Sequence, residues 1–180
     1  MVATRKGDGR RGAIALAAAG VAVGAAAAAL HRRRRAKQVP AADAGLVVRR
    51  LLEEPWQGNW EVIEELVSPS YLGHDTAEPE PTRGPAGVRA KVEQYLAAFP
   101  GAAITVEEQI AEGDRVATRW TSRGTQTGEI SGIAPTGKEV TFSGLTISRL
   151  ENGLVVEEWT TWDRLGLLVQ LGAIPEPARA

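Results

Sequence analysis

The sequence predicts an α+β fold in which helices come first and a curved antiparallel sheet follows and wraps around them. Apolar residues repeat at helical spacing before residue 100 and alternate with polar ones after residue 103. Two pairs of long alternating segments are joined by short turns, as in a meander of antiparallel strands. Residues 43–180 can bury about two-thirds of their extended surface, which is enough for a single core.

Three helices are expected in the first half of this domain. Asp43 has the side chain of an N-cap, and the apolar stripe that follows it ends at Pro55. A second helix is predicted over residues 58–67. The proline- and glycine-rich stretch 70–85 is expected to be a loop. A third helix is predicted from there to Pro100.

Alternating apolar residues predict four strands, arranged as two hairpins. The strands are expected at 104–111, 116–127, 140–150 and 154–162. Asn152-Gly153 is a strong signal for a type I′ turn between the last two. Residues 164–171 are predicted to form a short terminal helix, with Gly172 directly behind it.

Residues 1–35 predict a hydrophobic anchor helix with basic flanks. Its apolar run, 13–30, would be about 27 Å long as a helix, close to the roughly 30 Å of a hydrocarbon core. Residues 32–35 are all arginine, and this block favours a single-pass membrane protein with a cytoplasmic C-terminal domain. A cleaved export signal and a non-inserting segment on a cytoplasmic protein are the alternatives. Residues 36–42 are predicted to be a linker.

Composition excludes several function classes. The domain after residue 40 holds 12 basic and 21 acidic residues, so it lacks the clustered positive charge that nucleic-acid binding needs. The chain has no cysteine, which excludes disulfides and thiolate catalysis. Its two histidines, His31 and His74, are too few for a histidine-rich metal site, and no metal is expected.

The last predicted strand carries a candidate catalytic carboxylate. Alternation places Glu157, Trp159 and Asp163 on one face and Glu158 on the other. If the first face is concave, Asp163 lies in a partly apolar pocket, which raises the pKa of its carboxyl and makes it a better general base. As an alternative, Asp163 is the N-cap of the helix that follows it.

The other candidates also have plain structural explanations. His74 is the domain's sole histidine, and a lone histidine in a loop is often a turn or surface residue. The aromatic residues Trp120, Phe142 and Trp159 lie on strands, where they form either core or the wall of a ligand pocket.

A series of short motifs spans residues 43–175. They are Tyr71-Leu-Gly-His74-Asp75, Arg83-Gly84-Pro-Ala-Gly87, Ala98-Phe99-Pro100, Glu112-Gly113-Asp114-Arg115, Gly132-Ile-Ala-Pro135-Thr136-Gly137, Glu157-Glu158-Trp159, Trp162-Asp163 and Gln170-Leu171-Gly172. In this order and spacing they resemble the SnoaL-like polyketide (ester) cyclase family. The fold of that family is the ketosteroid-isomerase-like cone, with helices packed on the concave face of the sheet.

The resemblance implies a cofactor-independent enzyme that binds a small apolar keto ester. An aspartate of the family removes a proton from an activated carbon, and the carbanion attacks a carbonyl of the same molecule in an aldol-type ring closure. Asp163 matches that aspartate, and His74 matches a loop histidine expected to orient or protonate a substrate oxygen. Substrate contacts are expected from Tyr71, Phe99, Arg119, Trp120, Gln126, Phe142 and Trp159.

One departure from the family pattern keeps a second function open. Many relatives read Gly-Thr-His-x-Gly where this chain has Gln126 in place of the histidine, and an amide cannot shuttle a proton at neutral pH. A non-catalytic module of the same fold, tethered to the membrane and serving ligand binding or dimerisation, is therefore the alternative. Domains of this type often pair through their sheets, so a homodimer is expected.

Overall fold

A computed structural model of the chain describes residues 41–175. The predicted anchor helix at 1–35 and most of the predicted linker at 36–42 lie outside the described residues. Among the helices of residues 41–175, none is long and apolar enough to cross a membrane.

Helices lead the described part of the chain and close it. They are α2 (Ala41–Glu53), the 3₁₀ helix η1 (Glu54–Gln57), α3 (Glu61–Leu66), α4 (Gly84–Ala98) and α5 (Arg164–Leu171). Helix α2 ends two residues before Pro55, which lacks the N–H that a continuing α-helix would need. Gly58 then turns the chain with a φ of 89°.

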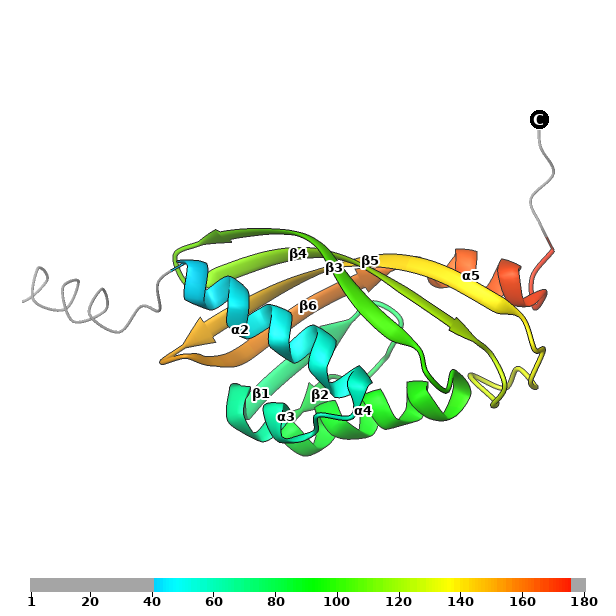
Figure 1. Cartoon of the computed structure of the whole chain (residues 1–180), viewed down its shortest axis with the longest axis horizontal. Helices are drawn as coiled ribbons and strands as arrows, with labels where there is room; N and C mark the ends of the chain where they lie inside the picture. Colours follow the sequence, from blue (N-terminus) through cyan, green and yellow to red (C-terminus); the bar gives the residue numbers. More distant parts are fainter. Residues whose placement is uncertain (1–40, 176–180) are drawn as a thin grey trace, which may run out of the picture. The chain divides into compact units, whose positions relative to one another are not determined.

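Six strands form one sheet in the order β2-β1-β6-β5-β4-β3. Their bounds are β1 (Val67–Asp75), β2 (Thr82–Arg83), β3 (Ala103–Glu112), β4 (Arg115–Thr125), β5 (Glu139–Glu151) and β6 (Leu154–Trp162). The sheet arches over α2, α3 and α4 (Figure 1). Helix α4 packs against β1 and α2 packs against β3, whereas α5 lies on β5.

Two sequence-based expectations about the sheet are wrong. The sheet is mixed rather than antiparallel, because β1 pairs with β6 in the parallel sense. Residues 70–75, predicted to be loop, complete β1, and the predicted helix over 58–67 is accordingly shorter. The strand is hard to recognise in the sequence because Gly73 is a residue type typical of loops. In the structure Gly73 lies under the ring of Tyr71, where an added Cβ would clash.

The two faces of the sheet differ in burial. The inner face, which is turned toward the helices, carries Thr118, Trp120, Ser122, Phe142, Thr146 and Glu158, all of them buried. The outer face carries Ala117, Arg119, Leu145, Ile147 and Trp159, which are exposed or half-buried. The predicted turn at Asn152-Gly153 is confirmed by positive φ values of 53° and 85°. The predicted helix 164–171 is also confirmed.

Candidate active site

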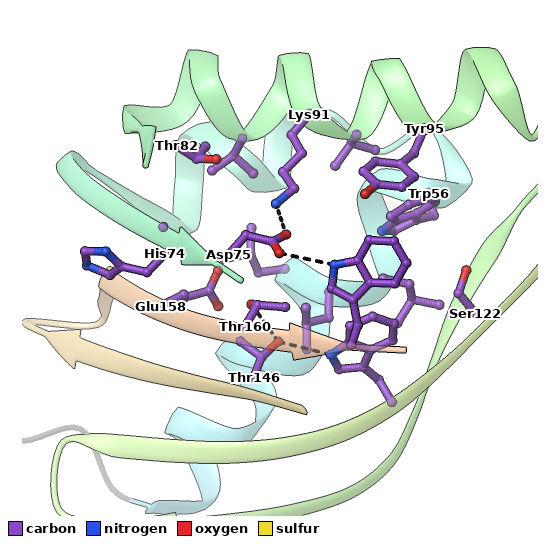
Figure 2. A pocket seen from close by; sticks show the side chains of 18 of the residues that line it. Trp56, His74, Asp75, Thr82, Lys91, Tyr95, Ser122, Thr146, Glu158 and Thr160 are labelled. Atoms are coloured by element: carbon purple, nitrogen blue, oxygen red, sulfur yellow. Dashed lines mark hydrogen bonds and ion pairs between the residues drawn. The ribbon is translucent and has the colours of Figure 1, made fainter. Parts of the chain in front are cut away.

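A cavity lies between the inner face and the helices α2, η1 and α4 (Figure 2). Its volume is about 140 Å³. Aromatic and aliphatic side chains make up most of its wall, and a few polar groups interrupt it. This combination is typical of small-molecule sites.

Glu158 is a buried carboxyl at one end of the cavity. It projects from β6 and accepts hydrogen bonds from the Tyr71 hydroxyl at 2.7 Å and from the Ser148 hydroxyl at 2.6 Å. Burial raises the pKa of Glu158, although both hydroxyl donors act in the opposite direction. A carboxyl whose pKa is raised is a stronger base than an ordinary one, and it can take up a proton and return it within one reaction.

Asp75 and Lys91 form an ion pair beside this carboxyl. The Lys91 ammonium, from α4, donates to Asp75 at the end of β1. The indole Nε1 of Trp162 donates to the same carboxylate at 3.2 Å, as does the backbone N–H of Ala77 at 2.9 Å. The Asp75 side chain is only 5% exposed, so its charge needs these partners. Lys91 also borders the cavity, where its ammonium can stabilise negative charge on a ligand oxygen.

Aromatic rings form the middle of the wall. Phe142 and Trp162 lie with ring centroids 5.2 Å apart, and Tyr95 meets Trp162 edge-on at 6.4 Å. Trp120 donates its indole N–H to Thr146 at 3.0 Å and lies against the bare backbone of Gly144. The wall therefore presents flat apolar surfaces, on which the N–H groups of Trp120 and Trp162 are occupied, whereas the Tyr95 hydroxyl has no hydrogen-bond partner among the described residues.

The structure places three of the predicted substrate-binding residues, Tyr71, Trp120 and Phe142, in the wall of the cavity. Their contact with a substrate stays a prediction.

Asp163 does not line the cavity. It is exposed, and its Oδ1 accepts the backbone N–H of Gly166 at 2.7 Å as the N-cap of α5. The expectation that this carboxyl points into the hollow is wrong, because the opposite face of β6 is the concave one. Since strand side chains alternate, Glu158 and Trp162 point inward, and Glu157 and Trp159 cannot.

His74 borders the cavity, but its ring belongs to the outer face. The ring stacks on Trp159 with centroids 5.7 Å apart, and Nε2 lies 3.1 Å from a Glu157 carboxylate oxygen. In Figure 2 the ring points away from Asp75 and Lys91. Trp159, predicted to contact substrate, thus lies outside the cavity wall.

The three other predicted substrate contacts also lie outside the wall. Arg119 is exposed and pairs with Glu108 at 3.4 Å. Phe99 is buried in the core cluster that includes Trp120. Gln126 is fully buried, and it holds the loop that follows β4.

The amide of Gln126 explains why glutamine suits this position. Its Nε2 donates to the carbonyl of Gly128 at 3.1 Å and to that of Ile133 at 3.2 Å. Its Oε1 accepts from the backbone N–H and the hydroxyl of Thr136 at 3.1 and 2.7 Å. Because the glutamine side chain has both N–H donors and a carbonyl acceptor, it can pair with the carbonyl groups and the N–H and hydroxyl groups of this loop.

Asp75, Lys91 and Glu158 were not predicted as site residues. Helical spacing could have identified Lys91, because Val88, Lys91, Val92 and Tyr95 share one face of α4 and all line the cavity. Within residues 41–175 no group of three or more acidic or histidine side chains is arranged to hold a metal ion.

The family model of the SnoaL-like polyketide cyclases matches residues 46–171. The chain therefore belongs to the SnoaL-like polyketide cyclase family. Among curated proteins, none matches it significantly.

Solved structures agree with this assignment. A candidate SnoaL-like polyketide cyclase from Jannaschia sp. CCS1 is 26% identical, with a TM-score of 0.69 over 76% of this chain and 97% of that one. AclR, a candidate hydroxylase from Streptomyces galilaeus, is 28% identical, with a TM-score of 0.68 over 77% and 87%. A hypothetical protein from Catenulispora acidiphila with a ketosteroid isomerase-like fold, 16% identical over 70% and 92%, has a TM-score of 0.59 and shows the fold.

Proposed function

We propose that the chain is a cofactor-independent cyclase that closes a ring in a small apolar keto ester, with Glu158 as the proton-transfer group. The observation that carries the proposal is a buried carboxyl of raised pKa at the end of an aromatic cavity. Similar proteins carry the names of two enzyme classes, cyclase and hydroxylase, so the choice between these two activities depends on the residues of the site. This carboxyl suits proton transfer from a carbon acid.

The proposed reaction balances without a co-reactant. Glu158 takes the proton from the carbon between two carbonyls, and the resulting enolate oxygen lies at the Lys91 ammonium. The carbanion then attacks a second carbonyl of the same molecule, forming a carbon–carbon bond. The new alkoxide takes the proton back from Glu158, so the aldol product is an isomer of the substrate.

The neighbouring groups support these roles. Asp75 compensates the charge of Lys91 and fixes the position of its ammonium. Tyr71 and Ser148 hold the two oxygens of Glu158, so that the carboxyl keeps one orientation. The cavity volume of about 140 Å³ is below the roughly 300–1,000 Å³ of typical ligand sites, which favours a small substrate.

A ligand-carrying role is the second candidate function. It is favoured by the two hydroxyl donors, which already occupy both oxygens of Glu158. A carrier would bind the keto ester and leave its acidic proton in place.

The test is exchange of the acidic protons of ethyl 3-oxo-3-(naphthalen-2-yl)propanoate in D₂O, followed by proton NMR. The full chain should accelerate exchange, and Glu158→Gln should lower the protein-dependent rate about 10²- to 10⁴-fold. The matched control is Glu157→Gln, the neighbouring residue on the outer face, which should exchange at the wild-type rate. Exchange by Glu158→Gln at the wild-type rate would contradict the assignment, and tight binding without exchange would favour the carrier.

A further inference from the structure

The hydroxyl of Ser122 is buried and has no hydrogen-bond partner among residues 41–175. Residues 41–175 contain seven buried polar or charged residues: Ser68, Thr118, Ser122, Gln126, Thr146, Ser148 and Glu158. Six of these side chains form hydrogen bonds with other described residues. The Ser122 hydroxyl forms none with any described residue, although Ser122 is only 2% exposed.

The unpaired hydroxyl faces the cavity. Every fully enclosed side-chain nitrogen or oxygen of the described part has a hydrogen-bond partner. The Ser122 oxygen must therefore touch open space, and Ser122 lines the cavity from the inner face of β4. A buried polar group normally has a partner, so a ligand or water atom completes this one.

Ser122 lies far from the proton-transfer end. It pairs across the sheet with Phe142, whereas Glu158 pairs with Ser148 on the same strand, β5. Ser148 lies six positions beyond Phe142, a path of about 20 Å along the strand. In Figure 2 Ser122 lies on the side of the cavity opposite His74 and Glu158.

The surroundings of Ser122 are apolar. Its cross-strand neighbours are Ile104 and Phe142, and its neighbours along the inner face include Trp120. A hydroxyl in such surroundings gives a ligand oxygen a directional contact.

We propose that Ser122 binds a second oxygen of the substrate, a carbonyl or hydroxyl carried at the far end of an apolar ring system. This inference rests on the proposed function for the position of the acidic carbon. The far oxygen and the acidic carbon are thus separated by the apolar middle of the cavity, with Ser122 at one end and Glu158 at the other (Figure 2). The substrate class is therefore an elongated keto ester with oxygen at both ends and an aromatic or polyene middle.

The test uses two ligands of equal shape. In the first, ethyl 3-oxo-3-(naphthalen-2-yl)propanoate carries an acetyl group at ring position 6; in the second it carries an isopropenyl group there, with CH₂ in place of the oxygen. Affinities for the full chain are measured by quenching of tryptophan fluorescence. Wild type should prefer the acetyl ligand about 3- to 10-fold, the value of one hydrogen bond, and Ser122→Ala should lose this preference.

Ser143→Ala is the matched control, because Ser143 is an exposed serine on the outer face of the same sheet. It should keep the wild-type preference. No preference in wild type, or an undiminished preference in Ser122→Ala, would overturn the proposal. Proton exchange is a separate readout: a preference that depends on Ser122 in a chain without exchange would leave this site standing and refute the cyclase.

Discussion

The two faces of the sheet carry the same kinds of residue in adjacent positions and use them differently. Glu158 on the inner face is enclosed by hydroxyl donors at the end of a cavity, and its pKa is raised by burial. Glu157, one residue earlier, lies on the outer face, where the hydrogen bond from His74 and that from Arg149 lower the pKa of its carboxyl. Alternation along β1 likewise places Asp75 on the inner face and the ring of His74 on the outer face. Chemical identity alone therefore does not make a site; the face that a residue occupies decides it.

After Glu158 itself, the largest expected effect on the exchange rate is at Lys91. Lys91→Met removes the cation that faces the developing enolate, and should lower the exchange rate about 10²- to 10³-fold. Arg119→Met removes a cation from the outer face and should leave the rate unchanged. Proton NMR of the keto ester in D₂O measures both, with circular dichroism to verify folding. Equal losses of the exchange rate in the two variants would contradict the assignment of the chemistry to the inner face.

Substitutions at the neighbouring positions Gly144 and Leu145 of β5 should differ in their effect on the free energy of unfolding. A Cβ at Gly144 would overlap the Trp120 ring on the inner face, so Gly144→Ala should lower the free energy of unfolding by about 1–3 kcal/mol. Leu145 is 53% exposed on the outer face, and Leu145→Ala should cost less than about 1 kcal/mol. Urea denaturation gives both values. A larger loss in Leu145→Ala would mean that the outer face is covered.

Substitutions of Asp163 should change the free energy of unfolding and leave the exchange rate unchanged. Asp163→Ala removes the N-cap of α5 and should cost about 1 kcal/mol in the free energy of unfolding. Asp163→Asn, which can still cap the helix, should restore most of that loss. Proton exchange should be unchanged in both variants, and a rate loss in Asp163→Asn would return this residue to the chemistry.

The neighbouring glutamates should give opposite pH dependences. The raised pKa of Glu158 stabilises the fold below its ordinary value of 4.5, and that contribution is lost as the pH rises through the raised pKa. The lowered pKa of Glu157 stabilises the fold above 4.5, and that contribution is lost as the pH falls through the lowered pKa.

These signs can be measured by urea unfolding between pH 3 and pH 8. Glu158→Gln should reduce the loss of stability on the alkaline side, and Glu157→Gln should reduce the loss on the acid side. Changes on the same side in both variants would contradict the assignment of the two faces.

The sequence was sufficient for the elements whose signals are local. Asn152-Gly153 and the last helix were predictable, because turn and cap chemistry act within a few residues. The parallel pairing of β1 with β6 was not, since it joins segments more than eighty residues apart. The concave face of β6 was assigned wrongly for the same reason: both faces of that strand carry a glutamate and a tryptophan, and only contact with β1 and the helices distinguishes them. Asp75 was hidden within a stretch predicted to be loop.

The most direct test of which face holds the chemistry is a crystal structure of the full chain with ethyl 3-oxo-3-(naphthalen-2-yl)propanoate bound. The ring system should lie between Trp120, Phe142 and Trp162, with the acidic carbon about 3–3.5 Å from a carboxyl oxygen of Glu158. A ligand bound on the outer face beside His74 and Trp159, or one whose acidic carbon lies out of reach of Glu158, would contradict the account.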